Sequence, residues 1–173
     1  MSKHGVMVAR ANPLQLGHEA VDEIMLESFG TKNSLQLLGS SNSPFSLKHF
    51  FNYSERRAFY KKVFPDLKVV GIPDYSTNQE WLGALDDLLI AANFDPKETV
   101  FYGGCEEDVT FFLEAKRTCI IINRFDGHTP KISATEVRDA LIYNRSLNGL
   151  VNPLIMDDVR NVFATKWEKF KQI

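Results

Sequence analysis

The sequence predicts an α/β fold in which a doubly wound parallel sheet of five strands carries helices on both faces. Three observations lead to this prediction. Short apolar segments alternate with amphipathic helical segments along the chain. The apolar segments are continuous runs, as strands are when helices cover both faces of a sheet. No repeat or linker interrupts the 173 residues, a length that suits one domain over residues 1–173.

The first third of the chain begins with a predicted strand at residues 5–11, GVMVARA. Apolar residues three to four positions apart then predict a helix over 17–29. SLQLLG predicts a second strand at 34–39. A loop rich in serine and asparagine covers 40–53. Loops of that length in compact domains more often have a function than serve only as connections. Ser54 is expected to begin the next helix, which extends to about residue 64.

The alternation continues in the middle of the chain. LKVVGI predicts a third strand at 67–72, and a helix with apolar residues on one side follows at 79–92. The fourth strand is expected at 99–102 and a helix at 106–115. TCIIIN completes the set as a fifth strand at 118–123. Strands that are each followed by a helix pair in parallel, as in Rossmann-like sheets.

Two further helices are predicted at 135–143 and 157–170. In sheets of this kind ligands bind at the carboxyl ends of the strands. Five segments are therefore candidates for a binding site: residues 10–18, 39–45, 72–78, 103–106 and 123–135.

Composition excludes several classes of function. A formal net charge of −2 argues against broad electrostatic binding of nucleic acid, although a local cluster can still bind a small anion. Cys105 and Cys119 are too few for a disulfide framework and indicate reduced thiols. Without a signal peptide or a membrane-spanning window, the chain is expected to be cytoplasmic and to bind no membrane. We also expect a homo-oligomer.

The segment ANPLQLGHEA, residues 11–20, lies where the first strand meets the first helix. Gly17 and His18 fall in the first helical turn, where backbone N–H groups are expected to be unpaired and to favour an anion. His18 can donate a hydrogen bond to a phosphate oxygen. The alternative is that Gln15 and His18 are only polar turn residues.

A second segment, KISATEVR, covers residues 131–138. Ser133 and Glu136 fit a capping box, which is a purely structural explanation. The same turn also presents the hydroxyls of Ser133 and Thr135, with Arg138 about one turn later. Hydroxyls, helix N–H groups and a guanidinium together suit a polyphosphate.

These two segments together resemble the double signature of the nucleotidyltransferase α/β superfamily, [H/T]-x-G-H and I-S-x-T-x-x-R. The resemblance covers nearly the whole chain and is closest to the archaeal-type nicotinamide mononucleotide (NMN) adenylyltransferases. Four more stretches match that family in order: Gly39-Ser40-Ser41; Phe51 to Arg57; Ile72-Pro73-Asp74 with Asn78 and Trp81; and Val100 to Gly104.

The resemblance implies that the enzyme transfers the adenylyl group of ATP to NMN, giving NAD and pyrophosphate. It implies Mg²⁺ carried mainly by the ATP phosphates, with no metal site made by the protein. The residues it assigns to catalysis are His18, Arg138 and Gln15. Those it assigns to ATP are Arg10, Asn12, Gln15, His18, Gly103, Gly104, Ser133, Thr135 and Arg138. Those it assigns to NMN are Ser40, Ser41, Asp74, Asn78 and Trp81, with Trp81 stacked on the nicotinamide.

Gln15 is the main departure from the family pattern, which has His or Thr there. A glutamine amide remains a neutral donor of longer reach, so we expect it to contact a phosphate oxygen. Loss of one charge-assisted bond would cost roughly 1–3 kcal/mol, or about a tenfold to hundredfold in rate. Two alternatives stay open: transfer to another acceptor (pantetheine phosphate, FMN or a cytidylyl acceptor), and a non-catalytic nucleotide-binding protein. The sequence also leaves open NMN or its deamidated acid form.

Overall fold

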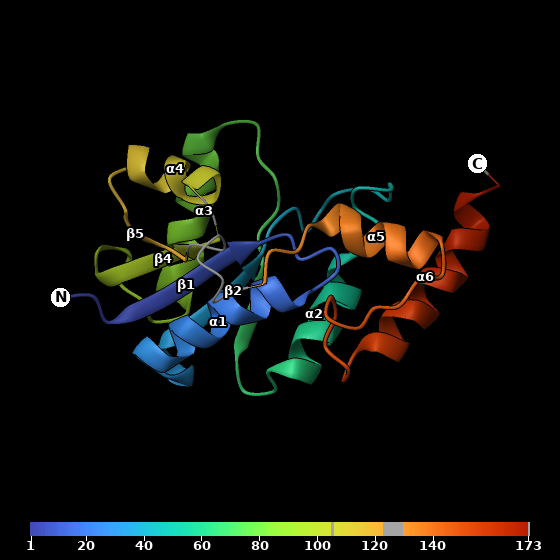
Figure 1. The fold of residues 1–173 in the computed structure, drawn as a ribbon. Coiled ribbons are helices and arrows are strands. Elements are labelled where there is room, and N and C mark those ends of the chain that lie inside the picture. Colours follow the sequence, from blue (N-terminus) through green and yellow to red (C-terminus); the bar gives the residue numbers. More distant parts are fainter. Residues whose placement is uncertain (105, 123–129, 173) are drawn as a thin grey trace.

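A computed structural model describes residues 1–104, 106–122 and 130–172 and confirms the predicted fold class. Five parallel strands form one sheet in the order β3-β2-β1-β4-β5 (Figure 1). The strands are β1 (His4–Ala9), β2 (Ser34–Leu38), β3 (Lys68–Gly71), β4 (Thr99–Gly103) and β5 (Thr118–Ile121). Each boundary lies within two residues of its prediction.

The helices also lie where the periodicity predicts them. They are α1 (Leu16–Phe29), α2 (Tyr53–Val63), α3 (Asn78–Ala91), α4 (Glu106–Glu114), α5 (Ala134–Ile142) and α6 (Met156–Phe170). Ser54 was wrong as the start of α2, because Asn52 caps that helix and its side chain accepts a hydrogen bond from the Glu55 backbone N–H. Two short 3₁₀ helices that were not predicted, Thr31–Asn33 and Pro96–Glu98, precede β2 and β4. No helix in the described ranges is long and apolar enough to cross a membrane.

Apolar side chains pack on both faces of the sheet. On one face, Met7, Leu38 and Tyr102 belong to a buried cluster that also contains residues of α1, α2, α5 and α6. On the other face, Leu37 and Phe101 belong to a cluster with residues of α3 and α4. Figure 1 shows α1 and the α3–α4 pair on opposite sides of the sheet. Consecutive strand residues supply the two faces because side chains alternate along a strand.

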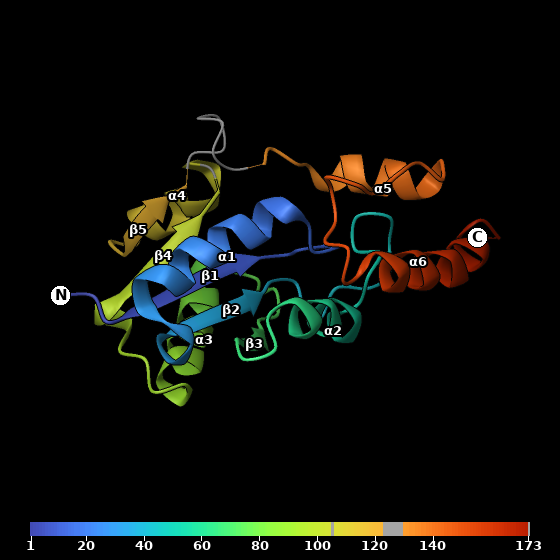
Figure 2. The same cartoon turned by 60° about the horizontal axis from the view of Figure 1, so that its bottom comes forward.

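The strand order reverses between β1 and β4, because the chain builds outward through β2 and β3 before it returns to β4 and β5. Ligands bind at such a switch point in doubly wound sheets. Helices α5 and α6 extend past the carboxyl ends of the strands, and α6 lies beside α2 (Figure 2). Residues from both halves of the chain can therefore meet above β1 and β4.

One feature of the sheet differs from the sequence prediction. Strand β5 was expected to be buried on both faces because TCIIIN is apolar, yet Thr118, Ile120 and Ile121 are exposed. The cause is topology: β5 is an edge strand that pairs only with β4 in the described part of the sheet. An apolar run alone does not distinguish a central strand from an edge strand.

A buried carboxyl in α1 makes stability depend on pH. Asp22 is fully buried next to the Tyr60 hydroxyl, which favours the ionised form of the carboxyl but does not offset its burial. Burial raises the pKa of Asp22 well above 3.8, and nearby Glu19 and Glu23 add to the effect. A carboxyl with a raised pKa gives its full stability below the pKa of the unfolded chain and loses it as pH rises.

We expect Asp22→Asn to stabilise the protein at pH 8 and to leave it near wild type at pH 4. Above the unfolded-state pKa, the buried carboxyl costs about 1.4 kcal/mol per pH unit until it ionises, and an amide does not titrate. Urea unfolding at pH 4, 6 and 8 measures how the free energy of unfolding changes with pH. Glu27→Gln, an exposed position on the same helix that is not among the charges acting on Asp22, is the control. Equal pH slopes for Asp22→Asn and wild type would contradict the prediction.

Candidate functional site

A cavity of about 510 Å³ lies at the carboxyl ends of β1 and β4. It is lined by residues 7–12, Gln15, His18, Lys48, Gly103, Gly104, residues 131–134 and Arg138. The cavity thus brings together every residue that the sequence assigned to ATP except Thr135. Thr135 lies beside it, since its Oγ1 accepts a 3.5 Å hydrogen bond from Arg138. Residues 11–18 and 131–138, far apart in sequence, form opposite parts of one site.

The first turn of α1 is not the open anion site that the sequence suggested. The Leu16 N–H donates to the Leu150 carbonyl at 2.9 Å, and the Gly17 N–H donates to Gln15 Oε1 at 2.5 Å. The N–H groups of His18 and Glu19 both donate to the Gln15 carbonyl. That expectation was wrong because a side-chain cap and a distant loop satisfy the backbone donors. Side chains must bind any phosphate at this end of the cavity.

His18 is oriented by a capping box. The Gln15 backbone N–H donates to His18 Nδ1 at 3.3 Å. In this geometry Nδ1 is the acceptor. The Gln15 backbone thereby sets the orientation of the imidazole ring at the cavity wall.

Gln15 and Asn12 are more constrained than the sequence indicated. Only 2% of Gln15 is exposed, which excludes a solvent-facing turn residue, and its Nε2 donates to the Ile132 carbonyl at 2.9 Å. Asn12 is also buried: its Nδ2 donates to the Phe51 carbonyl and its Oδ1 accepts from the Phe51 N–H, both at 2.9 Å. Both amides hold loops beside the cavity, and their roles toward ATP stay predictions.

The N-terminus of α5 retains open donors. Ser133 and Glu136 form the capping box that the sequence predicted, with bonds of 3.1 and 3.2 Å. Among the described residues, no acceptor meets the N–H groups of Ala134 and Thr135. Helix N–H groups of this kind favour an anion, which the dipole of α5 also stabilises. Of these two helix N-termini, that of α5 is therefore the one whose first N–H groups are available to an anion.

The charges on the cavity wall are all positive. Arg10, Lys48, Lys131 and Arg138 line it, and no carboxylate does so in the part of the chain described. Burial lowers the pKa of Arg138 below its ordinary value, and the positive charge of Arg10 also lowers it. An anionic ligand would relieve this unfavourable environment. Sequence reasoning missed Lys48 and Lys131; the length of the 40–53 loop hinted at function, but no pattern singled out a lysine.

A second cavity, of about 410 Å³, lies on the β3 side of the site. It is lined by Val8, Asp74, Tyr75, Thr77, Asn78, Trp81, Phe111 and Phe112. Three of the five residues assigned to NMN therefore share one cavity. Trp81 packs edge-on against Phe111 and faces Phe112 at a tilt, with centroid distances of 5.4 and 5.8 Å. Val8 lines both cavities, so the two meet at the end of β1.

Asp74 connects Ser40, one of the remaining two residues, to this cavity. Its carboxylate accepts hydrogen bonds from the hydroxyls of Ser40 at 3.0 Å and Ser43 at 3.1 Å. The Ser41 N–H donates to the Ile72 carbonyl at 3.1 Å. Ser40 has a left-handed backbone conformation, with φ of 51°, which is uncommon for a residue with a side chain and concentrates at functional sites.

A buried arginine holds the backbone segments that follow β1 and β2 at the site. Arg56 of α2 is 2% exposed, and its guanidinium donates to the carbonyls of Arg10, Gly39 and Ser40 at 2.6–3.3 Å. These carbonyls follow β1 and β2 directly. Arg56 therefore fixes both strand ends at the place where the two cavities meet. The sequence match at residues 51–57 included this arginine without indicating what it contacts.

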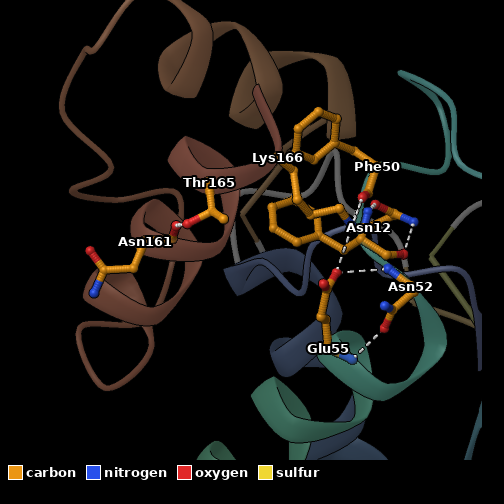
Figure 3. Close-up of polar contacts among 8 residues, drawn as sticks. Asn12, Phe50, Asn52, Glu55, Asn161, Thr165 and Lys166 are labelled. Atoms are coloured by element: carbon orange, nitrogen blue, oxygen red, sulfur yellow. Dashed lines mark hydrogen bonds and ion pairs between the residues drawn. The ribbon is translucent and has the colours of Figure 1, made fainter. Parts of the chain in front are cut away.

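The C-terminal helix holds the loop that carries Lys48. Lys166 of α6 donates to the Phe50 carbonyl and pairs with Glu55 Oε2 at 2.8 Å (Figure 3). The same carboxylate oxygen accepts the Asn52 N–H at 2.9 Å. The ammonium also lies 5.1–5.9 Å from the ring centroids of Phe45, Phe50 and Phe51. This set of contacts joins α6, α2 and the end of the loop.

We expect Lys166→Met to lower the free energy of unfolding by about 1–3 kcal/mol, because it removes two hydrogen bonds and leaves a half-buried Glu55 unpaired. Methionine retains the apolar contacts with the rings. The matched control is Lys171→Met at the C-cap of the same helix, whose partner Glu168 is exposed, and it should cost below about 0.5 kcal/mol. Equal costs in urea unfolding would show that the Lys166 contacts do not stabilise the loop.

Comparisons with known proteins were made by family, by sequence and by structure. No family model matches the chain, and no curated protein is significantly similar in sequence. Among the described residues, no three histidine, cysteine, aspartate or glutamate side chains cluster as metal ligands do.

Solved structures do match. A bifunctional NMN adenylyltransferase/ADP-ribose pyrophosphatase from Francisella tularensis aligns with a TM-score of 0.74 at 16% identity, over 87% of this chain and 45% of that one. The NadR protein in complex with NAD and AMP-PNP gives 0.65 at 17%, over 90% and 46%. A Vibrio parahaemolyticus protein named only provisionally as a nicotinate-nucleotide adenylyltransferase gives 0.59 at 21%, over 90% and 96%.

The chain spans less than half the length of the first two proteins. At 16–21% identity the comparison establishes the fold and not the substrate. The chain therefore has the fold of nucleotide adenylyltransferase structures.

Proposed function

We propose that this protein transfers the adenylyl group of ATP to NMN, which yields NAD and pyrophosphate. The observation that carries the proposal is the single cavity in which the α5 N-terminus, His18 and four cationic side chains converge. Such a site suits a polyphosphate, and the second cavity beside it suits an aromatic acceptor. The shared fold with structures of this enzyme class supports the proposal.

The reaction needs positioning and charge stabilisation more than covalent catalysis. The phosphate oxygen of NMN attacks the α-phosphorus of ATP, the bond to the bridging oxygen breaks, and pyrophosphate leaves with the electron pair. His18 Nε2–H donates to the α-phosphate as charge builds there. Ser133, Thr135, Arg138 and the open amides of α5 hold the β- and γ-phosphates. Gly103 and Gly104 line the part of the cavity where the adenosine would lie.

Mg²⁺ fits this site as an ion carried by the nucleotide. The described cavity wall offers cations and hydroxyls but no carboxylate, so phosphate oxygens and waters would supply most of its ligands. A divalent ion would offset charge on the triphosphate. The Francisella tularensis protein has been solved as a complex with AMP and a manganese ion.

The acceptor would occupy the second cavity. Trp81 would stack on the nicotinamide ring, and Asp74 and Asn78 would read its carboxamide. Because Asp74 also holds Ser40 and Ser43, the end of β2 would be fixed around the acceptor. Arg10 follows β1 and lines the first cavity, where it would contact phosphates of both substrates.

The test is direct synthesis. Purified protein with Mg²⁺, ATP and NMN should form NAD, detected by a coupled dehydrogenase, and pyrophosphate in equal amount. Nicotinic acid mononucleotide, FMN and phosphopantetheine are the competing acceptors. If the protein prefers one of these acceptors, that acceptor and not NMN is the substrate, and the reaction is still nucleotidyl transfer. Absence of any pyrophosphate release by folded protein would reject the proposal.

Trp81→Ala should raise the KM for NMN about fivefold to a hundredfold and leave the KM for ATP nearly unchanged, since stacking on a planar ring contributes about 1–3 kcal/mol. Trp167→Ala is the matched control: Trp167 stacks on Phe163 at 5.4 Å in α6, so its loss should lower Tm without changing the KM for NMN. An equal rise in both KM values for Trp81→Ala would show that Trp81 serves only to pack α3.

A further inference from the structure

Gln15 joins the two halves of the proposed phosphate site. Its Oε1 accepts from Gly17 N–H in α1, and its Nε2 donates to the carbonyl of Ile132, the residue before the cap of α5. The second bond connects positions 117 residues apart. Among the described residues, it is the hydrogen bond that ties Ile132 and Ser133 to another element. A side chain with both a donor and an acceptor is required for this connection.

Packing around Gln15 leaves little freedom. Leu14 and Ile132 both belong to the buried core. A Cβ at Gly17 would lie 2.6 Å from Gln15 Oε1 and 3.0 Å from the Pro130 carbonyl oxygen. The backbone at 130–132 therefore crosses directly over the first turn of α1, and the glycine permits this close approach. The Gln15 hydrogen bonds fix the register of the two segments.

We propose, on the basis of the function proposed above, that Gln15 is a positioning residue that holds the N-terminus of α5 opposite His18 before ATP binds. Gln15 also donates its backbone N–H to His18 Nδ1, so one residue orients groups on both sides of the cavity. Its side-chain amide acts through Ser133, Thr135 and Arg138 and not by direct contact with a phosphate. This role replaces the direct donor that the sequence alone suggested.

The test measures binding of Mg-ATP by calorimetry, without NMN and without turnover. Gln15→Met keeps the length of the side chain but removes both hydrogen bonds, and Gln15→Glu keeps the acceptor and loses the donor. Both should weaken ATP binding about tenfold. Gln36→Met is the matched control, because Gln36 is also fully buried and donates to a backbone carbonyl, that of Leu37 in β2. It should lower Tm and change the Kd for ATP less than twofold.

A double-mutant cycle with Arg138→Met separates positioning from direct contact. If Gln15 places Arg138, then Arg138→Met should weaken ATP binding much less in the Gln15→Met protein than in wild type. Additive effects of the two substitutions would show that Gln15 contacts the phosphates by itself. A Kd for ATP within twofold of wild type for both Gln15 variants would show that Gln15 neither positions α5 nor contacts ATP. Each of these results overturns the proposal. If Gln15→Met does not fold, the double-mutant cycle uses Gln15→Glu in its place. Wild-type protein that binds ATP but releases no pyrophosphate would reject the proposed function and leave this inference standing.

Discussion

Alanine at position 18 is expected to lower kcat for NAD formation about a hundredfold or more, and to change the KM for ATP only a few-fold. The reason is that a donor aimed at charge that develops in the transition state acts mainly on kcat. The capping box holds the His18 ring with Nδ1 as the acceptor, and His18 lines the cavity proposed for the triphosphate. Steady-state kinetics with each substrate varied in turn measures both constants.

Two variants control this experiment. His18→Asn retains a neutral donor and should recover part of the activity. His4→Ala removes a histidine that stacks on Phe94 at the opposite end of β1, and it should leave kcat unchanged. An unchanged kcat with a raised KM for the alanine variant would show that His18 binds only ground-state phosphate.

Arg138→Met is expected to raise the KM for ATP about tenfold to a hundredfold. A charge-assisted hydrogen bond to phosphate contributes about 1.5–3 kcal/mol, and Arg138 is the half-buried cation beside the open amides of α5. Its lowered pKa reflects burial that a bound phosphate would compensate. Arg138→Lys should recover only part of the affinity, because an ammonium cannot form the bidentate contact.

The control is Arg57→Met, which removes an exposed arginine from α2. It should leave the KM for ATP within twofold of wild type. If both variants raise the KM equally, long-range attraction by net charge explains the effect, and raising the salt concentration would abolish it. If Arg138→Met changes only the KM for NMN, the triphosphate does not lie against α5.

The helix and strand boundaries were predictable because they depend on local signals. Apolar residues three to four positions apart define α1 and α3, and continuous apolar runs define β2 and β4. The capping box at Ser133 was also readable, since its partners are three residues apart. The cap of α2 was misplaced because Asn52 and Ser54 are both good capping residues, and only the structure shows which side chain meets the helix.

Placement of the site residues at strand ends was predictable for the same reason. Parallel strands present their carboxyl ends at one edge, so the segments after β1 and β4 had to approach each other. The cavity there contains eight of the nine residues that sequence assigned to ATP, all but Thr135. Their individual roles remain predictions for the experiments above.

The sequence by itself determined the order of elements, the capping box of α5 and the edge of the sheet where polar residues collect, because these follow from contacts within a few residues. Only the tertiary structure decided which groups remain available there. The N–H groups at the start of α1 are satisfied by Gln15 and by Leu150, while in the described part of the chain no acceptor meets those of Ala134 and Thr135 in α5. Lys48 lines the cavity on a loop that Lys166 anchors. Bonds such as that from Gln15 to Ile132 join positions 117 residues apart, and no local pattern encodes a partner at that distance.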